Sequence, residues 1–319
     1  MRAMADRIQS AAASFLSGQS SSPAIVFLKR LWRERAVRAG ASIVGFVLLA
    51  ALLAPAVGYL LGHGPMEQFQ DTALDEMGLP IGPTLAFPLG ADGNGRDVLI
   101  RTLYGAQVSL IVGIPSTTIA MIIGTAIGLV SGFFAGRTDR VISQGIDVAL
   151  SFPFVVTALS LLSLNRGGTG QPIISPVVVV ILIISLFSWA YFARLTRGLV
   201  LELRTSPMVE ASRTIGASSA RIIWFDVLPN ILPTLFVYWA VQLPANIVAE
   251  ATLSFLGLGI QAPTPSWGNM IAEAQRTSLY QNQPWFLAGP GLALFLTVVG
   301  FNTLSAGLRN VLDPHRRRI

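Results

Sequence analysis

Gln242, Asn246 and Glu250 recur at four-residue intervals within a long apolar stretch of the chain. At that spacing the three side chains share one face of a helix, where they form a polar stripe. An ionisable group at mid-bilayer costs at least about 2.5 kcal/mol, so Glu250 should face protein, a cavity or the membrane interface rather than lipid. Two interpretations of the stripe stay open: a wet pathway through a membrane, or hydrogen bonds between packed helices.

No pattern typical of catalysis or nucleotide binding accompanies the stripe. The chain has no cysteine, HExxH or GxSxG sequence, which excludes a thiol nucleophile and the commonest hydrolase sites. Gly93-Asn94-Gly95 lacks the lysine of a phosphate loop, because Lys29 is the only lysine. His63 and His315 fall in loops at opposite ends of the chain, so we expect solvated surface rather than a shared metal site. We therefore expect no catalytic residue, metal or cofactor here.

A second group of polar residues lies between 206 and 230, in the sequence SPMVEASRTIGASSARIIWFDVLPN. Ser206 before a proline predicts a helix start, because the fixed φ of proline suits a first helical turn. Glu210 and Arg213 then lie three residues apart on one face of a short helix. Gly216 should end that helix, at a position where a residue without Cβ turns most easily.

A second short helix is expected from about residue 218, with Arg221 exposed and the apolar residues 222–225 available for packing. Pro229 and Pro233 should then open the next apolar stretch. Residues 206–230 are thus predicted to form a helix–glycine–helix unit, which we call the elbow.

The composition indicates that the bilayer is the natural solvent of this chain. Of its 319 residues, 52% are hydrophobic and 12% are charged, with a mean hydropathy of +0.63. Soluble domains carry about 25% charged residues. The net charge of +6 could indicate nucleic acid binding, but the positions of the basic residues assign it to membrane topology.

The apolar stretches predict an all-α, polytopic membrane protein with six transmembrane helices. These are expected at about 42–61, 108–135, 146–164 (containing Pro153), 172–192, 230–255 and 286–308, with a Gly-rich turn at 165–171 and a Pro/Trp-rich loop at 260–285. The chain divides into a polar segment 1–41 (loosely ordered over 8–22), the first transmembrane helix 42–61, a polar segment 62–102, a core 103–310 that holds five helices and the elbow, and a basic tail 311–319.

Glycines recur every four residues in the second expected helix and should let another backbone approach one of its faces. Packing within the same chain and packing against a partner subunit are both open. After this helix, Arg137, Asp139 and Arg140 are expected to form a short charged turn. The glycines concerned are Gly124, Gly128, Gly132 and Gly136.

Basic residues collect in segments 1–41, 137–140, 194–221 and 308–319, whereas 62–102, 165–171 and 260–285 hold few. An even number of spans puts both chain ends on one side. The positive-inside rule then places both ends and the elbow in the cytoplasm and the other polar segments outside.

The elbow resembles the EAA loop of ATP-binding-cassette importer permeases, which has Glu-Ala-Ala, a glycine four residues further on, and Leu-Pro about a dozen residues later. Two positions depart from that pattern: Ser212 replaces the second alanine, and Asp226 stands where isoleucine is usual. The matching residues are Glu210, Ala211, Gly216, Leu228 and Pro229.

Two further stretches are similar to the C-type subunits of dipeptide and oligopeptide permeases: PLGADGNGRDVLIRTLYGAQVSL before the second helix, and AEATLSFLGLGIQAPTPSWGNMI, which begins within the fifth helix and includes Glu250. The resemblance spans roughly residues 30–315. It implies a permease of the plasma membrane of a bacterium or archaeon. Such a permease forms a heterodimer with a second permease subunit. Two ATPases bind the ATP, and an extracytoplasmic substrate-binding protein completes the transporter. The expected substrate is a di- or oligopeptide, with nickel, glutathione or another small solute as alternatives; the surroundings are membrane lipid, with no nucleic acid.

The resemblance also implies roles for single residues. Glu210 and Arg213 would make polar contacts with an ATPase, Gly216 would set the angle between the two short helices, and Pro229 would help to hold the unit rigid. A membrane scaffold or exporter component, and a channel or membrane enzyme, are the competing classes. The expected coupling residues are Glu210, Ala211, Arg213, Gly216, Arg221 and Pro229, and the possible pathway residues are Gln242, Asn246 and Glu250.

Overall fold

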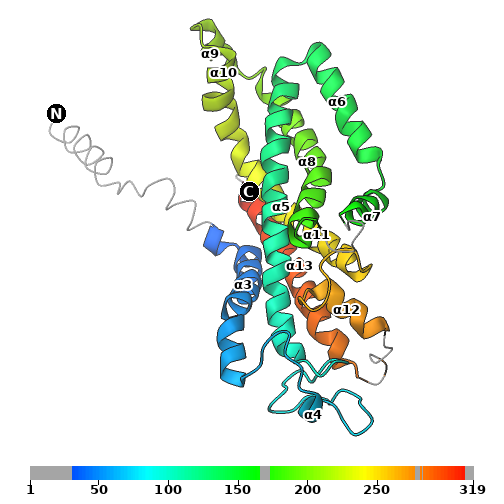
Figure 1. The fold of residues 1–319 in the computed structure, drawn as a ribbon. Helices are drawn as coiled ribbons and strands as arrows, with labels where there is room; N and C mark the ends of the chain where they lie inside the picture. The colour runs from blue at the N-terminus through cyan, green and yellow to red at the C-terminus, as the bar shows by residue number, and fades with distance from the viewer. Residues whose placement is uncertain (1–30, 166–172, 277–280, 282, 313–319) are drawn as a thin grey trace, which may run out of the picture.

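Helices make up every regular element that the computed structural model describes, over residues 31–165, 173–276, 281 and 283–312 (Figure 1). The predictions for 8–22, for most of the turn at 165–171 and for the tail with His315 lie outside these residues. The helices are α3 (Arg35–Leu61), α4 (Gln70–Ala73), α5 (Val98–Phe134), α6 (Gly136–Ser151), α7 (Phe154–Leu164), α8 (Pro176–Leu203), α9 (Pro207–Thr214), α10 (Ser219–Arg221), the π-helix η1 (Ile222–Val227), α11 (Leu228–Phe255), α12 (Trp267–Arg276) and α13 (Trp285–Leu312).

Five helices in the described residues are long and apolar enough to cross a membrane: α3, α5, α8, the continuous helix 219–255 and α13. The all-α, polytopic prediction is confirmed. The expected third span differs, because α6 and α7 meet at an angle of 80° and supply a sixth span only as a bent pair. The break lies at Phe152 and Pro153, where Phe152 has extended backbone, as a residue before proline prefers.

The glycines of α5 let α8 approach closely within the same chain. A Cβ on Gly124 would lie 2.4 Å from the Trp189 carbonyl oxygen, and one on Gly128 would lie 2.6 Å from the Ala193 carbonyl oxygen. Gly132 meets Val200 in the same way. This contact supports the packing of the glycine face within one subunit. Gly136 departs from the pattern, because it begins α6 with a φ of +61°.

Helices α3 and α13 pack antiparallel. Gly40 of α3 lies against Leu304, and Gly307 of α13 lies against Val37. The start of α3 and the end of α13 are therefore on the same side of the bundle. In Figure 1 the elbow lies toward that same end, and the polar segment that contains α4 lies at the opposite end. The structure thus places the elbow and the segment 62–97 at opposite ends.

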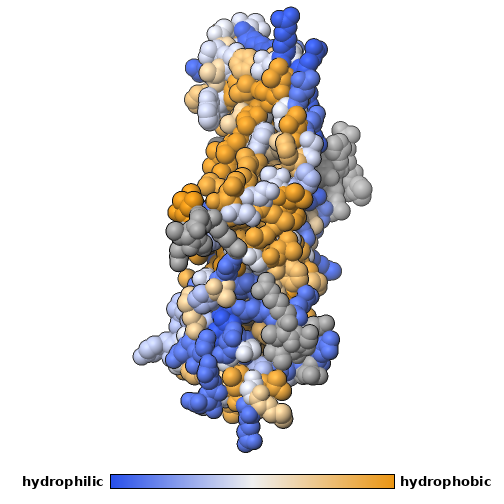
Figure 2. All heavy atoms as spheres, turned by 45° about the vertical axis from the view of Figure 1, so that its right-hand side comes forward, coloured by the Kyte–Doolittle hydropathy of each residue, from blue (hydrophilic) through white to orange (hydrophobic). Residues whose placement is uncertain are grey.

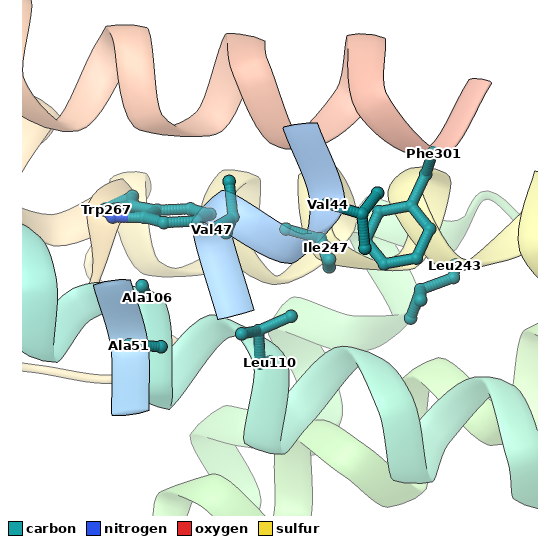
Figure 3. Close-up of a cluster of buried hydrophobic side chains, with 9 residues drawn as sticks. All are labelled: Val44, Val47, Ala51, Ala106, Leu110, Leu243, Ile247, Trp267 and Phe301. Atoms are coloured by element: carbon teal, nitrogen blue, oxygen red, sulfur yellow. The ribbon is translucent and has the colours of Figure 1, made fainter. Parts of the chain in front are cut away.

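Five helices contribute to one apolar cluster in the bundle (Figure 3). Trp267 of α12 is fully buried there, and its indole N–H donates to the Thr102 carbonyl oxygen at 3.0 Å. Its helix falls within the expected loop 260–285, which is thus partly helical. The cluster consists of Val44, Val47, Ala51, Ala106, Leu110, Leu243, Ile247, Trp267 and Phe301.

The surface of the bundle is divided into an apolar middle and polar ends. Figure 2 shows hydrophobic residues over the middle and upper part of one face, with hydrophilic residues gathered at the lower end and again at the top. Apolar side chains on the surface of the bundle include Leu52 at 75% exposure and Phe46 at 63% exposure, both on α3. Such an apolar belt is what lipid contact requires of a spanning helix.

Candidate functional site

The first helix of the elbow, α9, is set by local signals in its sequence. The Ser206 hydroxyl accepts from the Val209 N–H at 3.5 Å, and a proline occupies the first turn. The helix ends at Thr214, and Gly216 just beyond it has a φ of +82°, which is left-handed and favours glycine. The Gly216 N–H donates to the Arg213 carbonyl at 3.0 Å, which closes the last turn.

One buried side chain and one ring contact hold α9 against the bundle. Val209 is fully buried in an apolar cluster that also contains Phe133 of α5 and Val200 of α8. The Arg213 guanidinium lies 5.6 Å from the centre of the Phe133 ring, within cation–π range. Burial of a valine contributes about 1.5–3 kcal/mol, so α9 is anchored rather than loose.

The opposite face of α9 is open to solvent. Glu210 and Ala211 are exposed there, and Ile215 just beyond the helix is 85% exposed. The elbow therefore combines an anchored base with an accessible, mixed polar and apolar outer surface.

The second half of the elbow differs from the predicted pair of short helices. α10, η1 and α11 run as one helix from residue 219 to residue 255, so Pro229 lies inside a helix rather than at its start. The π-helical turn ends at Val227, two residues before Pro229, where an α-helix would press the proline ring against the carbonyl of Phe225. Pro229 and Arg221 are not buried. Ile222 is buried as expected, but Trp224 and Phe225 are 63% and 75% exposed.

Most of the polar stripe on α11 binds helices together. The Asn246 side-chain N–H donates to Thr117 Oγ1 of α5 at 2.8 Å, and its Oδ1 accepts from the Ser188 hydroxyl of α8 at 2.8 Å. Glu250 is fully buried and accepts from the Ser109 hydroxyl at 3.0 Å. For Asn246 and Glu250, the contacts support hydrogen bonding between helices.

Gln242, at the other end of the stripe, is partly buried and lines a cavity of about 290 Å³ between α8, α11 and the break between α6 and α7. The structure therefore brings Gln242 and Asn246 together at this cavity. Glu250 lies further along α11, where its Oε1 accepts from the Ser254 hydroxyl at 2.7 Å.

The sequence alone assigned no role to Asp92, Arg96 and Arg101. In the structure they form a buried charged network with Glu273 of α12. Arg96 Nη2 lies 2.8 Å from Glu273 Oε2 and Arg96 Nε lies 2.7 Å from Asp92 Oδ2. Arg101 is fully buried and donates to the Pro65 and Pro263 carbonyls at 3.1 and 3.2 Å. These contacts fasten segment 62–97 to the start of α5 and to α12, so the segment is ordered by charge pairing. The spacing of charges in GADGNGRDVLIR was the available signal.

The expectation that His63 is a solvated surface residue is wrong. Its Nδ1 lies 2.7 Å from Asp97 Oδ2, and its ring stacks on Phe87 with centroids 4.7 Å apart. Asp97 caps α5 through its other oxygen, which accepts from the Leu99 N–H at 2.8 Å. His63 therefore supports the start of α5.

The predicted charged turn at 137–140 is the first part of α6, and it is tied to α8. Arg197 Nη2 donates to Asp139 Oδ2 at 2.7 Å, and Arg197 Nε pairs with the other carboxylate oxygen. The Ser131 hydroxyl donates to Asp139 Oδ1 at 2.6 Å. This fork-to-fork pairing fixes the angle at which α6 leaves α5.

Comparison with known proteins decides which family this arrangement belongs to. Residues 124–318, which include the elbow and the polar stripe, match the family described as "Binding-protein-dependent transport system inner membrane component". The chain belongs to this family. It is accordingly a membrane permease subunit of an ATP-binding-cassette importer, and such a permease works with other transporter subunits.

Relatives of this permease carry related names. It is 36% identical over 289 residues to the glutathione transport system permease protein GsiD of Pectobacterium atrosepticum, covering 90% of each chain. It is 37% identical over 290 residues to the dipeptide transport system permease protein DppC of Bacillus subtilis, covering 91% of this chain and 85% of that one.

A solved structure of the methionine transporter MetNI in an inward-facing conformation shares the fold. The TM-score is 0.54 at 20% sequence identity, over 68% of this chain and 97% of that one. The permease fold inferred from the sequence is thus confirmed by both kinds of comparison.

Proposed function

We propose that this permease is one half of a peptide importer of a bacterial or archaeal plasma membrane. It pairs with a second permease subunit, and two separate ATPases bind and hydrolyse the ATP. An extracytoplasmic binding protein delivers di- or oligopeptides to the end of the bundle that carries segment 62–97.

The observation that carries the coupling role is the geometry of the elbow. Val209 is fully buried, while Glu210 and Ala211 on the same short helix are exposed. A force applied to the exposed face reaches α5 and α8 through packed side chains rather than through a loop. The second half of the elbow is the first part of the helix 219–255, which continues to the buried stripe, so a tilt of the elbow would be transmitted to α11.

The orientation in the membrane is supported by charge. The end of the bundle that carries the elbow also carries Arg35, Arg38, Arg137 and Arg140, at the starts of α3 and α6. The positive-inside rule favours the cytoplasm for that end. The elbow would then lie where ATP is available, and the opposite end would face a binding protein.

A peptide substrate is supported by the dipeptide permease among the relatives, whereas the glutathione permease among them supports glutathione as an alternative. Glutathione, nickel or another small solute are the alternatives. Uptake by proteoliposomes separates them, with the permease pair, its ATPases and the binding protein reconstituted together. We expect ATP-dependent uptake of labelled dipeptides that requires the binding protein. Uptake of nickel or glutathione but of no dipeptide would overturn the proposed substrate, and uptake without the binding protein would overturn the proposed delivery by that protein.

A further inference from the structure

The cavity at the break between α6 and α7 has the lining of a ligand site. It occupies about 290 Å³, just below the range of about 300–1,000 Å³ that small-molecule pockets span. Its walls come from three directions: Phe152 and Phe154 at the break, Phe187 and Tyr191 on α8, and the Gln242 side of α11.

Sequence features far apart in the chain produce this space together. Pro153 turns the chain by 80°, so no helix fills the angle between α6 and α7. On α11, Ala245 and Ala249 present small side chains to the cavity, one helical turn apart. On α8, Phe187 packs edge-on against Phe154 with centroids 5.3 Å apart, which fixes one aromatic wall.

The polar groups of the cavity are amides and hydroxyls. Asn246 is held by Thr117 and Ser188, so its carboxamide has a fixed orientation. Gln242 Nε2 donates to Asn246 Oδ1 at 3.4 Å, and within the described part of the chain Gln242 Oε1 accepts no hydrogen bond. That oxygen can accept from an N–H of a ligand. Tyr191, 47% exposed, can donate its hydroxyl proton from the α8 wall.

The charge of the cavity restricts its occupant. None of the described residues that line it is charged. Moving an ion into such surroundings without a partner costs several kcal/mol, whereas an apolar group gains about 25 cal/mol for each Å² that it buries. The cavity therefore suits a neutral apolar or aromatic group attached to an amide.

We propose that this cavity is a substrate subsite within the permease, which binds a neutral side chain of a peptide in transit together with its neighbouring backbone amide. The inference rests on the proposed function of peptide import. It adds a second selection step inside the membrane, after the binding protein, which favours neutral over charged side chains.

Protection of a single thiol tests the subsite, because the chain has no cysteine of its own. Ala245→Cys places a thiol in the cavity wall, and Val248→Cys places one on an exposed position of the same helix outside the cavity. Both variants are studied in the complete transporter with a membrane-permeant maleimide, and labelling of this chain is followed by mass spectrometry. Ala249→Cys is a second cavity position, for use if Ala245→Cys does not assemble.

A neutral dipeptide such as Leu-Phe, at about ten times its half-saturating concentration, should slow labelling of Ala245→Cys about tenfold, because only the empty site reacts. It should leave labelling of Val248→Cys unchanged, and a Lys-Glu dipeptide should protect much less. Equal protection at both positions, or none at Ala245→Cys while the unmodified transporter imports Leu-Phe, would overturn the subsite alone. A transporter that imports no peptide would overturn the proposed function as well.

Discussion

The guanidinium carbon of Arg213 lies 5.6 Å from the centre of the Phe133 ring, and this contact joins the elbow to the end of α5. A cation–π pair at an exposed site contributes about 0.5–1 kcal/mol. Arg213→Gln should therefore loosen α9 modestly, with faster amide hydrogen exchange over residues 207–214. Arg221→Gln is the matched control, because Arg221 contacts Phe225 of its own helix and not the bundle. Equal exchange in both variants would show that Arg213 does not anchor α9.

Gly216 should be intolerant of a side chain because of its backbone and not because of crowding. Its φ is +82°, and a Cβ added at this position would meet no atom within 4 Å. A β-branched residue in this conformation costs about 1–2 kcal/mol, so Gly216→Val should shift the angle after α9 and lower substrate-stimulated ATP hydrolysis of the assembled transporter. Gly78→Val carries the same kind of strain, with a φ of +74° and open space, at the opposite end of the bundle. Loss of stimulation in both variants, with a lower melting temperature of both transporters, would point to general misfolding.

Asp139 and Arg197 should behave as a pair. Asp139→Asn removes the charge that Arg197 binds at 2.7 Å, and Arg197 is about one-third exposed, so the loss should be about 1 kcal/mol. We expect a lower melting temperature in detergent for either single variant. The exchange Asp139→Arg with Arg197→Asp should recover part of that loss. An exchange variant less stable than both single variants would argue against the pairing.

Glu250 distinguishes a structural role from a pathway role. Glu250→Gln keeps groups that can bond to the Ser109 and Ser254 hydroxyls, now 3.0 and 2.7 Å from the carboxylate, so folding and transport should persist. Glu250→Leu leaves these buried hydroxyls without that partner, at about 1–3 kcal/mol for each unsatisfied group. The melting temperature should fall in the leucine variant only. A stable Glu250→Gln protein that no longer transports would instead place the carboxylate in the pathway.

Much of the fold could be predicted because the bilayer demands long apolar helices, and these stand out in the sequence. The angle of the bend at Pro153 could not be predicted from the sequence, because a proline within an apolar stretch is compatible with a mild kink or with the 80° bend observed. Pro229 looked like a helix start because the π-helical turn before it carries no sequence signal that we recognised.

The candidate site was predictable where it depends on local signals and not where it depends on distant partners. Ser206, Val209 and Gly216 act within a few residues of each other, so the short helix of the elbow could be inferred from spacing and capping. Asn246 and Glu250 find their partners on α5, 129 and 141 residues away. Contacts between residues so far apart in the chain cannot be deduced from a single sequence. For that reason the sequence left two interpretations of the stripe open.

The central claim is that a separate ATPase binds the elbow on the cytoplasmic side of the membrane. Cross-linking at Ala211 tests this claim most directly. Ala211 is exposed on α9, and Ala211→Cys would be the single thiol of this chain. Met77→Cys, at a position 84% exposed at the opposite end, is the control. We predict that in intact cells Met77→Cys reacts with an impermeant maleimide and Ala211→Cys does not, and that Ala211→Cys forms a cross-link to a nucleotide-hydrolysing subunit in inside-out vesicles. Labelling of Ala211→Cys from outside, or the absence of any such cross-link in an active transporter, would contradict the claim.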